Sequence, residues 1–128
     1  MNDIEQNRSI AQELIRAFGR LDLSRICEIV SPDADWWVVG QETAKRDAVL
    51  KSFQNLPGGK AIRGEVDILD TIAEGDKVMI EWRGALDFAD GRTYRNEYIW
   101  IVTFQNSQVI KIRVYNNMDK VRTFFQIA

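Results

Sequence analysis

The segment from Asp90 to Asn117 constrains the fold more than any other part of this chain. Two runs of strand-forming residues lie on either side of a short polar turn at Asn106 and Ser107, as in a hairpin. The even positions of these runs carry Tyr94, Asn96, Tyr98, Trp100, Val102 and Phe104, then Ile110, Ile112, Val114 and Asn116. Because side chains alternate between the two faces of a strand, the pattern predicts one apolar wall bearing a few amides and phenols. Such a wall suits a small, mostly apolar molecule.

The N-terminal part of the chain has a helical period instead. Apolar residues recur at helical spacing from Ile4 to Phe18, and Asp22 can cap a second helix over residues 23–30. A third helix is predicted from Thr43 to Phe53, and a short terminal one from Met118 to Ile127. Most of the predicted helices therefore precede the hairpin.

Further strands are predicted from Asp35 to Val39, from Ala61 to Ile72 and from Lys77 to Phe88, with a turn at residues 31–33. Helices followed by consecutive hairpin-linked strands indicate the α+β class. We expect a curved antiparallel sheet wrapped round the N-terminal helices, enclosing a conical cavity, as in a cystatin-like α+β barrel. A length of 128 residues predicts a single domain spanning residues 1–128.

The chain contains no histidine and one cysteine, Cys27. This composition excludes Ser-His-Asp and Cys-His catalysis and removes the commonest transition-metal ligand. We therefore expect neither a metal nor a cofactor, and acid–base chemistry would have to use carboxylates, tyrosines, lysines or water.

Net charge and hydropathy limit the classes of partner that the chain could bind. The net charge of −2, with both signs interspersed, gives no nucleic-acid surface, and no apolar run approaches bilayer length. The lone cysteine and the absence of a secretory signal predict a soluble, cytoplasmic protein.

Several segments resemble the nuclear transport factor 2-like superfamily, and within it the SnoaL-like and ketosteroid-isomerase-like branch. Besides the N-terminal helix pair, they are residues 33–40 (DADWWVVG), 73–78 (AEGDKV), 90–98 (DGRTYRNEY) and 113–117 (RVYNN). The resemblance implies the cone-shaped fold. It does not imply one reaction, because the superfamily contains isomerases, cyclases, epoxide hydrolases, dehydratases and binding modules without catalysis.

The catalytic residues of ketosteroid isomerases are not found at the matching positions. Their carboxylate base, helix tyrosine and neutral carboxylic acid correspond to about Val38, Leu14 and Trp100. Without a base and two donors, enolate formation in that manner fails.

The Asp-Arg-Asp set of limonene-epoxide-hydrolase-like members corresponds here to Trp82, Gly84 and Asn117. An amide cannot act as a carboxylate base at neutral pH. Many SnoaL-like cyclases end their last strand with an aspartate where Asn117 stands, and Asp119 would need a register shift to reach the cavity mouth.

The resemblance and the inward-facing strand positions together give a set of candidate site residues. The candidate catalytic residues are Tyr98, Asn117 and Asp119, and the candidate substrate-binding residues are Trp36, Val38, Trp82, Asn96, Trp100, Val114 and Asn116. The tryptophans could equally fill a small cone as core, and Asn116 and Asn117 could start a turn.

Three functions remain open. The first is a cofactor-free isomerase, cyclase or (de)hydratase acting on an apolar, cyclic polyketide-, terpenoid- or steroid-like substrate. The second is a binding or accessory domain with the cavity but no chemistry, and the third is a transport-type peptide adaptor.

The odd positions of the strands predict the outer face of the sheet. Met79, Ile99, Ile101 and Thr103 give that face enough apolar surface to suggest a partner subunit. The resemblance implies a homodimer through this face.

Overall fold

The computed structural model describes residues 3–56 and 59–125. The described helices and strands, in chain order, are α1 (Ile4–Gly19), α2 (Leu23–Ile29), β1 (Val30–Val38), β2 (Ala44–Lys45), α3 (Arg46–Gln54), β3 (Ala61–Glu74), β4 (Lys77–Phe88), β5 (Thr93–Gln105), β6 (Gln108–Asn116) and α4 (Met118–Phe125). None of the described helices is both long and apolar enough to span a bilayer. The predicted last helix extends to Ile127, and its final two residues lie outside the described part.

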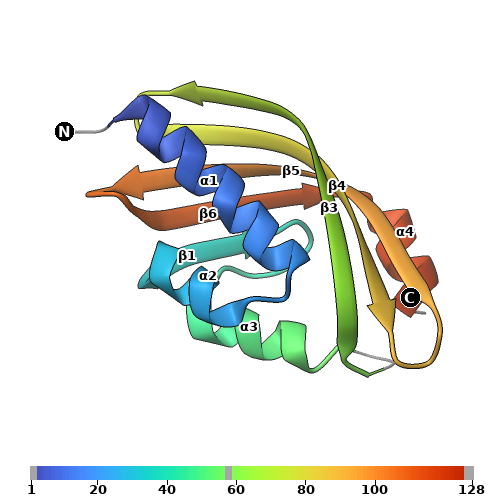
Figure 1. The fold of residues 1–128 in the computed structure, drawn as a ribbon. Coiled ribbons are helices and arrows are strands. Elements are labelled where there is room, and N and C mark those ends of the chain that lie inside the picture. The colour runs from blue at the N-terminus through green and yellow to red at the C-terminus, as the bar shows by residue number, and fades with distance from the viewer. Residues whose placement is uncertain (1–2, 57–58, 126–128) are drawn as a thin grey trace.

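The strands form one strongly curved sheet in the order β2-β1-β6-β5-β4-β3. In Figure 1, α1 lies across the concave side of this sheet, and α2 and α3 lie beside it. These features confirm the predicted α+β cone. The sheet does not close into a barrel, because β2 and β3 are its free edges. It is also not wholly antiparallel, because β1 runs parallel to β6.

The start of β1 differs from the prediction. Residues 31–33, predicted as a turn, belong to a strand that begins at Val30. The pairing of β1 with β6 is interrupted between Val30 and Asp35, which explains how a strand tolerates Pro32. Likewise, the predicted helix from Thr43 begins only at Arg46, because Ala44 first pairs with Trp36 as the short strand β2.

The prediction that the even-numbered residues of β6 face the interior holds from Ile112 onward but is wrong at Ile110. Phe104 pairs with Val109 and Thr103 pairs with Lys111, so Ile110 is an extra residue in a β-bulge. Ile110 is consequently 36% exposed, whereas Val109 is fully buried and takes its place in the core.

The carboxyl end of α1 lies directly against β3. A Cβ atom on Gly64 would lie only 2.6 Å from the Gly19 carbonyl oxygen, so this approach requires a glycine on the strand. Because Gly19 and its neighbour Phe18 both face the interior of the cone, the contact fixes one wall of the cavity described below.

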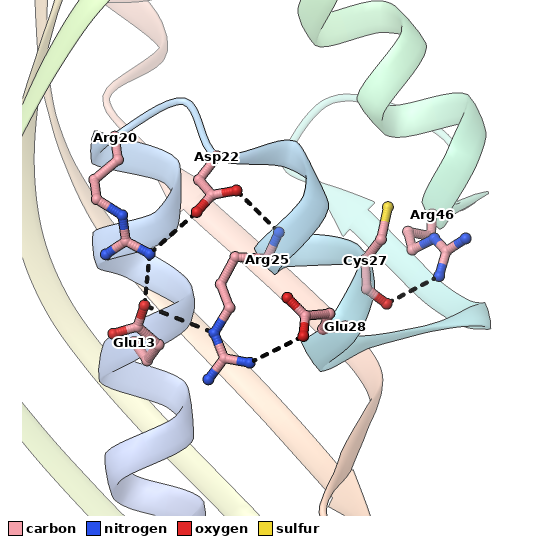
Figure 2. Close-up of polar contacts among 7 residues, drawn as sticks. All are labelled: Glu13, Arg20, Asp22, Arg25, Cys27, Glu28 and Arg46. Atoms are coloured by element: carbon pink, nitrogen blue, oxygen red, sulfur yellow. Dashed lines mark hydrogen bonds and ion pairs between the residues drawn. The ribbon is translucent and has the colours of Figure 1, made fainter.

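A charged cluster holds the corner between α1 and α2 (Figure 2). Arg20 Nη2 lies 2.7 Å from Glu13 Oε1 and 3.5 Å from Asp22 Oδ2. Asp22 also accepts a hydrogen bond from the Arg25 amide and so caps α2. Each exposed pair contributes little stability alone, but the shared geometry orders the turn that follows α1.

Arg46 connects α3 to the end of α2. Its guanidinium, which is mostly buried, donates to the carbonyl oxygens of Cys27 and Val30 at 3.3 and 3.1 Å. These carbonyls lie where α2 ends, and a cation is favourable there. The contact helps to position α3, one side of which lines the cavity described below.

Candidate functional site

A cavity of about 250 Å³ lies inside the cone. Its wall combines the end of α1, the inner face of β1 and β3–β6, one side of α3 and one side of α4. The volume lies below the roughly 300–1,000 Å³ typical of pockets for drug-sized ligands. The space suits a molecule of one or two rings.

Five aromatic side chains of the sheet line the cavity: Trp36, Trp82, Tyr94, Tyr98 and Trp100. The Trp82 and Tyr98 rings are stacked, with centroids 4.2 Å apart and an interplanar angle of 17°, because the two residues are direct cross-strand partners. Trp100 contacts Trp82 and Trp36 edge to face, each at 5.8 Å, and Phe18 meets Trp100 at 5.1 Å. These contacts fix ring orientations around an apolar space.

Gly84 makes room for the Trp82 indole. A Cβ atom at this position would lie 2.8 Å from Trp82 Cζ3. The indole can therefore lie over the strand beside its own position only because residue 84 has no side chain.

Three buried polar atoms in the wall have no hydrogen-bond partner among the described residues: Trp82 Nε1, Trp100 Nε1 and Asn116 Oδ1. Tyr98 adds a phenol. Burial raises the pKa of Tyr98 well above its ordinary value, and the nearby Tyr94 and Glu97 raise it further. At neutral pH the phenol is therefore a neutral hydrogen-bond donor and not a base.

The structure brings most of the predicted site residues together. Seven of them line the cavity: Trp36, Val38, Trp82, Tyr98, Trp100, Val114 and Asn116. The strand pleat explains this grouping, since each residue lies on the inner face of β1, β4, β5 or β6.

Asn96 lies on the same face of β5 as Tyr98 and Trp100 but does not line the cavity. Its side chain is 2% exposed, and protein groups occupy all of its hydrogen-bonding capacity. The Nδ2 atom donates to the Tyr94 hydroxyl and to the Asn117 carbonyl, while Oδ1 accepts from the amides of Glu97 and Asn117. Asn96 therefore joins β5 to the residue that precedes α4.

Asn117 and Asp119 also lie outside the cavity wall. Asn117 Nδ2 donates to Glu97 Oε1 at 3.2 Å, and its Oδ1 accepts from the Asp119 amide at 3.1 Å, at the start of α4. The Asp119 side chain is 93% exposed and faces Arg122. The register shift that would carry Asp119 to the cavity mouth is not present.

Sequence reasoning missed the lining residues that α3 and α4 contribute, including Ser52, Phe53, Val121 and Phe125. Helical periodicity shows which side of a helix is apolar but not which part of the sheet it covers. It also missed Glu65, the one carboxylate among the described lining residues. This side chain is 72% exposed and lies 3.1 Å from Arg63, at the rim of the cavity.

Within the part of the chain that the structure describes, no three histidine, cysteine or carboxylate side chains gather in a way that could hold a metal ion. Apart from Glu65 at the rim, the polar groups of the described lining are indoles, phenols, amides and one hydroxyl, which are poor metal ligands.

The curved sheet, the covering helices and the enclosed apolar space define a cone-shaped protein of the nuclear transport factor 2-like type. The chain belongs to the SnoaL-like domain family, whose family model matches residues 11–112. The resemblance predicted from the sequence is thereby confirmed. Among curated protein sequences, no match is found.

Solved structures show the same fold at low identity. A nuclear transport factor 2-like protein of unknown function from Burkholderia pseudomallei K96243 is 16% identical, with a TM-score of 0.79 over 94% of this chain and 97% of that one. PrhC from Penicillium brasilianum NBRC 6234 is 10% identical, with a TM-score of 0.82 over 97% and 88%.

An LEH-like epoxide hydrolase from M. tuberculosis is 14% identical, with a TM-score of 0.78 over 98% of this chain and 92% of that one. At such identities the likeness establishes the fold and not the chemistry.

Proposed function

We propose that this protein binds a small, uncharged and largely apolar molecule in the cone cavity. One observation carries the proposal: the described lining is rich in aromatic and aliphatic side chains, and Glu65, its one charged side chain, lies at the rim. Placing a charged ligand there would remove its hydration without supplying an opposite charge, which is costly. An apolar ligand instead gains the transfer of its surface from water.

A pair of matched variants tests the cavity. Val114→Phe should fill space at the wall, whereas Ile110→Phe adds a similar ring to the exposed bulge of the same strand. We expect the wild type and Ile110→Phe to bind tetralin with equal affinity by isothermal titration calorimetry, and Val114→Phe to bind it at least about tenfold more weakly. Equal binding by both variants would place the ligand elsewhere.

A cofactor-independent isomerase, cyclase or (de)hydratase is the second candidate. The observation in its favour is Tyr98, a phenol in the cavity wall that stays protonated because burial raises its pKa, and whose hydroxyl can donate to a carbonyl, epoxide or hydroxyl oxygen. A buried carboxylate base is missing among the described lining residues, and Glu65 reaches only the rim.

Hydrogen–deuterium exchange at the carbon next to the carbonyl of α-tetralone tests this second reading. An enzyme of this kind should speed exchange in deuterated water, and Tyr98→Phe should remove most of the acceleration. If α-tetralone exchanges no faster with the wild-type protein than in buffer alone, the catalytic function is contradicted and the binding function is not.

We also propose a homodimer through the outer sheet face. Ile72, Met79 and Ile101 are aligned neighbours across β3, β4 and β5, and the row continues to Arg113 and Trp37. Arg113 lies over the Trp37 ring at 4.2 Å. Such a row joins exposed apolar groups into one patch of the kind that partner surfaces cover.

A further inference from the structure

We infer that charge sets the orientation of the two protomers: Glu81 on β4 of each protomer pairs with the partner subunit's Arg113 on β6, and the two-fold axis runs along the strands at Ile101. This inference rests on the homodimer proposed above and assigns the geometry of its interface. It starts from the outer face of the sheet, where Glu81 and Arg113 lie on opposite sides of β5.

The apolar row on this face is complementary to itself. It runs from Ile72 on β3 to Trp37 on β1, with Ile101 on β5 at its centre. A two-fold rotation about an axis along β5 lays the β3 side of one protomer on the β1 side of the other. Ile72, which is 59% exposed, then packs on the partner subunit's Trp37, and Ile101 meets its own copy.

The neighbouring row of the same face carries an unbalanced negative charge. Glu81 is exposed and is the direct cross-strand partner of Asp70, so two carboxylates lie side by side. Like charges at such positions are unfavourable. The ion pairs that the structure shows for β4 involve three other side chains, Lys77, Arg83 and Asp87. Glu81 therefore has no cationic partner within the described part of its own chain.

Arg113 is the matching cation on the other side of β5. Its guanidinium lies over the Trp37 ring at 4.2 Å and donates to the Tyr115 hydroxyl at 3.0 Å. These two contacts hold the side chain on the outer face, yet it reaches no carboxylate among the described residues. A guanidinium has further donors for a carboxylate, and arginine is the cation best suited to ion pairs in interfaces.

The position of the two charges selects the direction of the axis. With the axis along the strands, the residue opposite Arg113 is Met79, and Glu81 lies two residues further along β4, about 7 Å away. Extended arginine and glutamate side chains together span this distance. Lys77, on the other side of Met79, is balanced by Asp76 at 3.5 Å.

An axis across the strands gives the opposite result. It would place Glu81 on its own copy and Arg113 on its own copy. Like charges that meet in an interface are strongly unfavourable, so the distribution of charge favours the axis along the strands.

The experiment reverses the two charges, singly and together. Glu81→Arg, Arg113→Glu, the double variant and an equimolar mixture of the two single variants are compared with the wild type by size-exclusion chromatography with light scattering, over a series of concentrations. Circular dichroism checks that each variant is folded. Glu28→Arg is the matched control, because it makes the same change of charge at a side chain that is 65% exposed on α2 and not on the sheet.

The wild type and Glu28→Arg should dimerise equally well. Each single variant should dimerise at least about tenfold more weakly, because both of its symmetry-related contacts then bring like charges together. The equimolar mixture and the double variant should recover most of the lost affinity, since opposite charges meet again in both.

Single variants that dimerise as tightly as the wild type overturn the inference and leave the proposed dimer standing. A mixture that associates no better than its components does the same. A wild-type monomer contradicts the dimer as well. Salt gives a second measurement that needs no variant: sodium chloride should weaken the wild-type dimer by screening the attraction. A dimer that salt leaves unchanged or strengthens overturns the assigned pairing.

Discussion

Gly84 is the residue on which the orientation of the Trp82 indole depends. Gly84→Ala should displace the ring, because the new Cβ would lie 2.8 Å from Trp82 Cζ3. Crowding of this kind costs about 1–3 kcal/mol, measurable by urea unfolding. If the ring is the cause, the cost should largely disappear in a Trp82→Leu background. The same loss in both backgrounds would assign it to the backbone instead.

The Tyr98 phenol should stay protonated in the folded protein under alkaline conditions, because burial raises its pKa. Its stabilising contribution is fully present below the unfolded pKa of about 10, and it is lost as pH rises through the folded pKa. Above about pH 10, the free energy of unfolding should fall faster in the wild type than in Tyr98→Phe, by up to about 1.4 kcal/mol per pH unit. Parallel curves from urea unfolding would contradict this.

At the scale of single elements, α4 closes one side of the cavity through exposed contacts. Val121 and Phe125 line the cavity, yet no residue of α4 is fully buried. Lys120 Nζ lies 2.6 Å from Glu97 Oε2, and Arg92 donates to the Phe124 carbonyl oxygen and stacks on its ring. The helix is therefore attached by a few surface polar groups and by ring contacts of Phe124 and Phe125 with Phe88 and Tyr94.

Lys120→Gln should loosen α4 selectively. The expected result is faster hydrogen exchange of residues 118–125 at neutral pH, with the sheet unchanged. Lys51→Gln on the exposed side of α3 is the control. Hydrogen bonds from Lys120 and Asn117 lower the pKa of Glu97, so this attachment is present above the unfolded pKa of about 4.3 and is lost as pH falls through the folded pKa. Unchanged exchange in Lys120→Gln would show that the aromatic contacts alone hold the helix.

The elements also show what the sequence could predict. The pleat placed Trp82, Tyr98 and Trp100 on the inner wall because alternation is a local property of a strand. The bulge at Ile110 depends on pairing with β5, and local alternation carries no information about it. Alternation assigns a residue to one face of the strand but does not show whether a cavity lies in front of it. Asn96 was therefore predicted to contact the ligand, whereas its side chain joins β5 to the residue before α4.

At the scale of the whole molecule, the outer face of the sheet predicts the oligomeric state. Size-exclusion chromatography with light scattering should give a dimer, and Ile101→Lys should give a monomer, because a charge would enter the centre of the apolar row. Ile4→Lys, which changes an exposed apolar residue on α1, should leave the dimer intact. A wild-type monomer at micromolar concentration would contradict the proposed interface.

The fold of the whole molecule was predictable because a long strand meander after helices has few compact arrangements. The candidate site was less predictable, because the cavity and its lining depend on how the helices pack on the sheet. From the sequence alone, Trp82 and Trp100 could equally be core residues or part of a pocket wall. Their unpartnered nitrogens become visible only with the tertiary contacts in place.

The most direct test of the cavity as a binding site for a small apolar molecule uses the indole signals of the four tryptophans in a nitrogen–proton correlation spectrum. Single Trp→Phe variants assign the peaks, and tetralin is then titrated into the wild-type protein. The Trp82 and Trp100 indole signals should shift as the probe enters, because both side chains line the cavity, while the Trp37 signal on the outer face stays in place. Unmoved Trp82 and Trp100 signals at saturating probe, or a shift confined to Trp37, would contradict the account.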